Sequence, residues 1–88
     1  MTTRLTDLEW GYVSHALQSF DPEALTRDTR DSINPRRAVE AIDDDLRTGG
    51  WPGDVRATAW RARRKYLHEW ATRPLTEVAA WDKEADRA

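Results

Sequence analysis

Three consecutive aspartates, Asp43 to Asp45, are the residues of this chain best suited to bind a metal ion. Asp54 is the twelfth position counted from Asp43, which matches the length of a calcium-binding loop between two helices. However, Arg47 stands where such a loop supplies an oxygen ligand, and Thr48 stands where it needs glycine. The sequence therefore predicts no metal site and a solvated or arginine-paired aspartate triplet.

The two histidines, His15 and His68, are the candidates for acid–base catalysis. Neither has a second histidine or a carboxylate in the spacing of a helical zinc site. Ser14 is adjacent to His15, and adjacent helical side chains point apart, so these two residues do not form a nucleophile–base pair. The chain contains no cysteine, which excludes disulfides and thiolate zinc sites. We therefore predict a protein that is not an enzyme and that holds no cofactor.

Positive charge gathers in residues 54–73, which carry six basic and two acidic side chains, although the whole chain has a net charge of −2. At about 100° per residue, a basic face forms along one helix, made of Arg61, Arg64, Lys65 and His68. This face is either neutralised by the acidic remainder of the chain or meets an acidic partner. A nucleic-acid-binding helical domain using these four residues is the alternative function. The acidic chain and the mid-helix position of the charge argue against it.

Five tryptophans are more than a single core of this size readily hides. Trp60 and Leu67 lie on a second apolar strip, offset from the strip that contains Tyr66. Tryptophan with arginine is typical of interface hot spots, and Trp60 and Arg64 are spaced for a cation–π contact. The predicted protein interface contains Trp51, Arg56, Trp60, Arg63, Arg64 and Leu67. Alternatively, Trp51 covers Trp60 within a single molecule.

Helix-capping patterns divide the chain into helices that position these residues. Thr6 and Glu9 form a capping box, and Asp21 and Asn34 each precede a proline in the usual order of helix starts. No segment has the pattern of a strand. We predict an all-α fold, a small compact bundle of four to five short helices around a central helix. The predicted helices, within one domain of residues 1–88, cover about 6–20, 22–30, 35–48, 54–72 and 76–86.

The connection before the central helix has three predicted features. Gly49 is expected to take the left-handed conformation after the preceding helix. Residues 51–54, with proline second and glycine third, fit a type II turn. Asp54 is the predicted N-cap of the central helix.

A chain of 88 residues is long enough for one modest core. No apolar run has the length of a membrane span, and no signal-like segment opens the chain. We therefore expect a soluble, cytoplasmic protein without membrane contacts. The predicted function is a non-enzymatic protein–protein interaction module. It docks a second copy or another protein through the Trp/Arg patch on the central helix.

Overall fold

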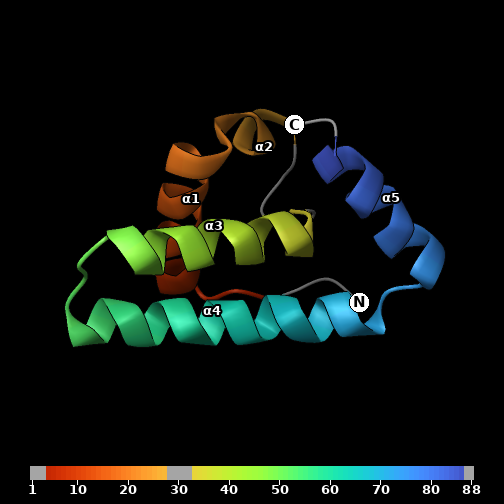
Figure 1. Cartoon of the computed structure of the whole chain (residues 1–88). Helices are drawn as coiled ribbons and strands as arrows, with labels where there is room; N and C mark the ends of the chain where they lie inside the picture. Colours follow the sequence, from red (N-terminus) through yellow and green to blue (C-terminus); the bar gives the residue numbers. More distant parts are fainter. Residues whose placement is uncertain (1–3, 28–32, 87–88) are drawn as a thin grey trace.

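Five helices account for most of the residues that the computed structural model describes, and the described part contains no strand. These residues are 4–27 and 33–86, without the side chains of residue 27 and residues 81–86. The helices are α1 (Asp7–Phe20), α2 (Pro22–Arg27), α3 (Pro35–Thr48), α4 (Gly53–Thr72) and α5 (Leu75–Asp86) (Figure 1). The predicted all-α class is confirmed. The predicted end of the second helix, at residues 28–30, lies outside the described residues.

The longest helix, α4, organises the packing. The extensive helix–helix contacts are those of α3 with α4, of α1 with α3 and α4, and of α1 with α2. Figure 1 shows α3 and α4 side by side and antiparallel, with α1 crossing them. Helix α5 leaves the end of α4 at an angle and makes none of these extensive contacts.

Small side chains build the core between α1, α3 and α4. The hydrophobic residues of these helices that are at most 1% exposed are Val13, Ala16, Leu17, Ala38, Ala41, Ile42, Ala59, Ala62 and Tyr66. Alanine predominates, so the helix backbones approach one another closely and each residue buries little apolar area. Larger side chains that are partly buried, including Trp10, Trp51 and Trp70, pack around this centre.

The predicted helix starts are confirmed at two places. The backbone N–H of Thr6 donates to Glu9 Oε1 at 2.9 Å, and the N–H of Glu9 donates to Thr6 Oγ1 at 3.2 Å, which completes the capping box. The Asn34 side chain accepts a hydrogen bond from the N–H of Arg36 at 2.9 Å. These caps satisfy backbone donors that the first helical turn leaves unpaired.

The turn between α3 and α4 differs from the prediction. Gly50 is the left-handed residue, with φ of 62°, whereas Gly49 has helical angles. Gly53 has no positive φ and is the first residue of α4, so the type II turn is wrong. Pro52 is the N-cap residue and makes no side-chain cap, so Asp54 lies inside the first turn. Proline has a fixed φ, and the value at Pro52, −66°, suits the residue before a helix. Helix α4 therefore begins at Gly53, one residue before the predicted N-cap Asp54.

Gly49 cannot accept a side chain without a shift of its neighbours. A Cβ atom there would lie 2.6 Å from the carbonyl oxygen of Asp45 and 2.6 Å from Trp51 Nε1. We expect Gly49→Ala to lower the free energy of unfolding by about 1–2 kcal/mol. The control is Gly11→Ala, where a Cβ would meet nothing within 4 Å. It should raise the free energy of unfolding by about 1 kcal/mol through helix propensity. Urea titrations measure both changes, and changes of the same sign would contradict the expectation.

Candidate protein-interaction surface

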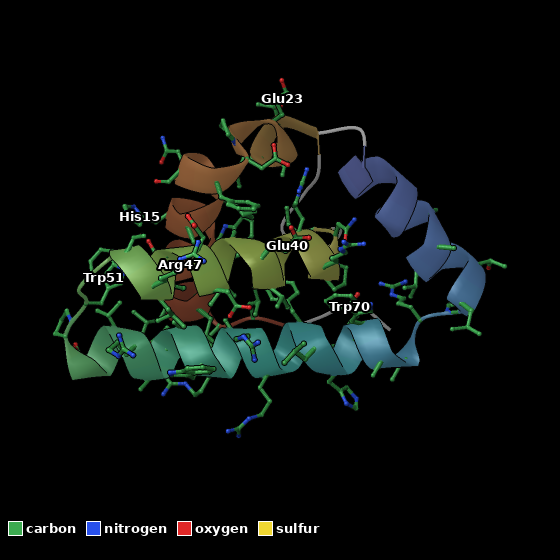
Figure 2. All side chains as sticks on the ribbon, viewed as in Figure 1. His15, Glu23, Glu40, Arg47, Trp51 and Trp70 are labelled. Atoms are coloured by element: carbon green, nitrogen blue, oxygen red, sulfur yellow. The ribbon has the colours of Figure 1, made fainter. Side chains whose placement is uncertain are left out.

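The two faces of α4 have opposite environments. Ala59, Ala62 and Tyr66 are at most 1% exposed, so their strip faces the core. Trp60 is 47% exposed and Leu67 is 37% exposed on the second strip. Figure 2 shows side chains that project from α4 on the side away from α3. The described part of the chain therefore leaves the second apolar strip open.

The open strip has the spacing of a helix-pairing surface. Ala57, Trp60, Arg64, Leu67 and Ala71 are all exposed and follow one another at intervals of three and four residues. This is the spacing of the a and d positions along a coiled-coil contact. At 1.5 Å per residue, the strip is about 21 Å long. We call these five residues the α4 seam.

Arg63 holds the tryptophan of the α4 seam in place. Its Nε and Nη2 atoms lie 2.6 and 3.3 Å from the two carboxylate oxygens of Asp43 on α3. The same guanidinium lies over the Trp60 ring, with 5.4 Å between Cζ and the ring centroid. Arg63, and not the predicted Arg64, is therefore the cation–π partner of Trp60. The ion pair with Asp43 fixes the guanidinium on the Trp60 side of the helix.

Glu9 neutralises part of the predicted basic face. Its carboxylate is 2% exposed, and its Oε1 accepts a hydrogen bond from Lys65 Nζ at 2.6 Å. Arg61 Nε lies 3.9 Å from the other oxygen. Burial works to raise the pKa of Glu9, but the hydrogen bonds from Lys65 and Thr6 outweigh it and lower this pKa. Glu9 is therefore a carboxylate at neutral pH, and its charge is shared with two of the basic residues.

Three further polar residues of α4 are exposed to solvent. They are Arg56, Arg64 and His68. Among the side chains that the structure describes, neither Arg56 nor Arg64 forms an ion pair. Of the four residues proposed for nucleic-acid binding, two thus lie beside Glu9 and two remain free of it.

The aspartate triplet divides among three roles. Asp43 pairs with Arg63 of α4, and Asp44 pairs with Arg47 of its own helix at 2.6 Å. The Oδ2 atom of Asp45 accepts hydrogen bonds from Tyr12 Oη at 2.7 Å and from Trp51 Nε1 at 2.5 Å. The prediction of an arginine-paired triplet therefore holds for the first two aspartates, whereas the third binds aromatic donors.

Trp51 is fixed within the chain by this network. Its ring and the His15 ring meet in a T-shaped arrangement with 5.4 Å between their centroids, and its N–H donates to Asp45. Burial and the neighbouring Asp45 carboxylate raise the pKa of Tyr12, so its hydroxyl remains a donor. None of these contacts of Trp51 involves Trp60, so they give no support to the alternative in which Trp51 covers Trp60.

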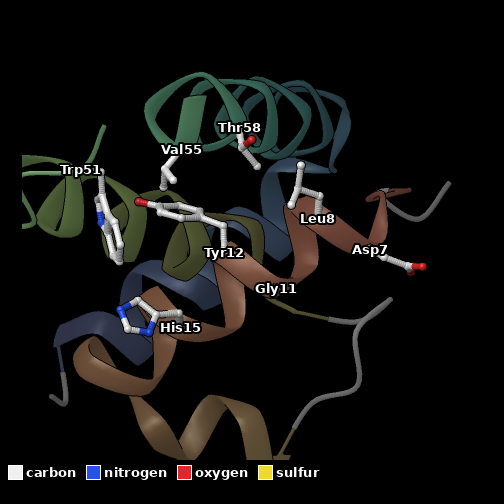
Figure 3. Close-up of a pocket in the computed structure, with 8 residues that line it drawn as sticks. All are labelled: Asp7, Leu8, Gly11, Tyr12, His15, Trp51, Val55 and Thr58. Carbon is white, nitrogen blue, oxygen red and sulfur yellow. The ribbon is translucent and has the colours of Figure 1, made fainter. Parts of the chain in front are cut away.

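A cleft of about 350 Å³ lies between α1 and the start of α4 (Figure 3). Its lining is mostly apolar, and Leu8, 69% exposed, forms part of its rim. His15 and Asp7 both line it, but they are eight residues apart on α1, about 12 Å along the axis. Figure 3 shows their side chains at different ends of the cleft. These two groups therefore do not form a hydrogen-bonded acid–base pair.

These features define the class of the molecule as a small all-α domain whose longest helix is exposed along one face. Comparison of the chain with protein-family models, curated proteins and solved structures found no match. In the part of the chain that the structure describes, no helix has the length and apolar character needed to cross a bilayer. Nor do the side chains of that part include a group of three or more metal-ligating residues.

Two polar groups escape prediction from the sequence. They are the buried Glu9, as an ion-pair centre, and the half-buried Asp45, as an acceptor for two aromatic donors. Glu9 precedes Tyr12 and Val13 by three and four residues, so helical spacing places it on their buried face. This position on a buried face indicates that the Glu9 carboxylate needs a cation beside it. For Asp45 no comparable indication exists, because its donors come from α1 and from the turn.

Proposed function

We propose that this chain is a non-enzymatic protein-interaction module that docks through the α4 seam and the arginines beside it. The observation that carries the proposal is the exposure of Trp60, 47%, on a helix whose opposite face is buried. Trp60 is also held by Arg63, so the indole presents an ordered apolar surface. Ordered tryptophan and arginine side chains are the residues that most often dominate interface energies.

Leu67 extends this apolar contact by two helical turns. It is 37% exposed and lies seven residues after Trp60, on the same side of α4. Arg56 and Arg64, which pair with none of the carboxylates that the structure describes, supply positive charge near the two apolar anchors. Such a surface suits a partner that buries apolar side chains at its centre and places polar or acidic groups at its rim.

The nucleic-acid alternative has less support. Lys65 and Arg61 share the charge of Glu9, so fewer free cations are available to neutralise phosphates. Affinity for a mixed-sequence duplex should therefore be weak and should fall only shallowly with salt concentration. Tight binding that falls steeply with salt would favour the nucleic-acid alternative instead.

The Trp60→Ala substitution tests the docking proposal. Because Trp60 is half exposed, the free energy of unfolding should fall by no more than about 1 kcal/mol, chiefly through the lost contact with Arg63. Association through the α4 seam should be lost. Urea titration measures the first effect, and sedimentation at micromolar concentration measures the second.

Leu8→Ala is the matched control, because Leu8 is 69% exposed on α1 and lies outside the α4 seam. It should change neither stability nor association. A loss of about 3 kcal/mol or more in Trp60→Ala is typical of a core aromatic and would contradict the docking role. A wild type that stays monomeric restricts the partner to a different protein.

A further inference from the structure

We propose that the cleft between α1 and the start of α4 binds a small, uncharged aromatic molecule, which lies against the backbone at Gly11. This site is separate from the α4 seam, so the proposal does not depend on the docking function. Three observations support it: the open space beside a mid-helix glycine, walls that present carbon, and the confinement of the carboxylate and the imidazole to the ends of the cleft.

The packing of the chain gives no reason for a glycine at position 11. Gly11 lies in the interior of the 14-residue helix α1, where glycine lowers helix stability relative to alanine. Its φ is not positive, and a Cβ there would meet no described atom within 4 Å. Neither the backbone conformation nor a close neighbour therefore requires glycine. A glycine also allows a ligand to approach the backbone closely, and this role fits the open space.

Gly11 forms the floor of the cleft. It lies three residues after Leu8 and four before His15, so these three residues share one side of α1. All three line the cleft, and Figure 3 shows Gly11 between the other two. Val55 and Thr58 of α4 line the opposite side. A ring placed on Gly11 would therefore contact both helices.

The walls beside this floor present carbon to a ligand. The Tyr12 hydroxyl and the Trp51 indole N–H both donate to Asp45, which does not line the cleft. The Thr58 hydroxyl donates to the carbonyl oxygen of Asp54 at 3.1 Å. These polar hydrogens are thus used within the chain, and the shared acceptor fixes both aromatic rings. Ordered and mostly apolar walls of this kind are typical of small-molecule sites.

The carboxylate and the imidazole of the lining lie at its ends. Asp7 and His15 are eight residues apart on α1, and Figure 3 shows them at opposite ends of the cleft. A charged group over Gly11 would lose contact with water and would meet carbon, which is unfavourable. An uncharged ring loses little solvation there and gains apolar contact. The lining therefore favours an uncharged aromatic ligand.

The size of the cleft limits the ligand to one or two rings. Small-molecule sites usually enclose about 300–1,000 Å³. The volume of this cleft, about 350 Å³, is near the lower limit of that range. A two-ring compound is therefore a suitable probe.

Titration with naphthylmethanol, followed by proton–nitrogen NMR, tests the site. We expect saturable shifts of the Gly11 backbone N–H and the Trp51 indole N–H signals, with a Kd of about 1 mM or tighter. Naphthoate and naphthylmethylammonium carry the same rings with a negative and a positive charge. Each should bind about tenfold more weakly than the alcohol, or weaker still.

Gly11→Leu fills the space that the ring would occupy. It should weaken the binding of naphthylmethanol by about tenfold or more, because the leucine side chain and the ring compete for the same volume. Leucine favours a helix more than glycine does, so the fold should be retained, and circular dichroism checks this. Gln18→Leu is the matched control, because Gln18 is exposed two turns further along α1 and does not line the cleft. It should bind the probe as the wild type does.

The contrary results are distinct from one another. A wild type without saturable shifts overturns the proposal, and so does a Gly11→Leu variant that binds as tightly as the wild type. Shifts centred on the Trp60 indole would place the probe on the α4 seam and also overturn it. Equal binding of either charged probe would overturn the uncharged class of ligand. Failure of the docking function appears separately, in Trp60→Ala, because Trp60 does not line the cleft.

Discussion

Replacing Asp45 with alanine is expected to lower the free energy of unfolding by about 2–4 kcal/mol. A single oxygen of this carboxylate accepts hydrogen bonds from both Tyr12 and Trp51. Tyr12 is only 7% exposed, so its hydroxyl loses its acceptor where water has little access. A buried donor without a partner is destabilising by about 1–3 kcal/mol, and here two donors are affected.

Asp44→Ala is the matched control for this prediction. Asp44 belongs to the same triplet, but among the described side chains its carboxylate pairs with Arg47 alone, whose side chain is 74% exposed. Exposed pairs of this kind contribute little, so the change should stay within about 0.5 kcal/mol. Urea titration measures both variants, and the tryptophan emission spectrum reports release of Trp51. Equal effects of the two substitutions would contradict the role assigned to Asp45.

The helices were predictable because their determinants are local. The capping box of Thr6 and Glu9 and the Asn34 cap each involve residues within three positions of one another. The strip containing Ala59, Ala62 and Tyr66 follows from helical spacing alone. Neither kind of pattern needs information about distant parts of the chain, and both agree with the structure.

The partners of polar side chains were not predictable in the same way. The three consecutive aspartates look equivalent in the sequence, yet helical rotation directs Asp43 to α4 and Asp45 to α1 and the turn. Which carboxylate meets which donor depends on how α3 is rotated against its neighbours. Likewise, the two adjacent glycines look equivalent in the sequence, yet Gly50 takes the left-handed conformation and Gly49 lies beside Trp51.

The sequence predicted the residues of the candidate surface but not whether the rest of the chain covers them. Helical spacing predicted a second apolar strip around Trp60 and Leu67, but it could not show whether another helix of the chain covers the strip. The structure leaves both side chains exposed and places Trp51 against α1 and α3 instead. Whether a strip is covered is a property of the whole packing, which the strip's own residues do not determine.

Glu9→Ala is expected to lower the free energy of unfolding at pH 7 by about 2–3 kcal/mol, because it removes both a helix cap and a charged hydrogen bond. The cap is the bond from Thr6, and the charged bond is the one from Lys65. Lys65 is 39% exposed, so water screens part of the attraction and the charged bond contributes at the low end of its usual range. Glu9→Gln separates the two parts, since glutamine retains the cap and loses the charge.

The charge of Glu9 predicts a definite pH dependence. Its pKa in the folded protein lies below the usual value of 4.5, so the folded state binds the proton more weakly than the unfolded state. The stabilisation is therefore complete above the unfolded-state pKa and disappears as pH falls through the folded-state pKa. The stability difference between wild type and Glu9→Gln, measured by urea titration, should shrink towards zero over that acidic range. A difference that persists at the lowest pH would assign the effect of Glu9 to shape and not to charge.

Glu9→Gln also connects stability with the choice between the two functions. Without the carboxylate, Lys65 and Arg61 are no longer neutralised, and the outer side of α4 gains free positive charge. If the basic face were built for phosphate, Glu9 would oppose that role, and the variant should bind a mixed duplex more tightly and with a steeper salt dependence. The proposed docking through the α4 seam depends on Trp60 and Leu67 instead, so it should survive the substitution. In one outcome, Glu9→Gln gains affinity for the duplex and still associates through the α4 seam as the wild type does. That result would identify Glu9 as the residue that keeps this helix from binding nucleic acid and leaves it for protein contacts.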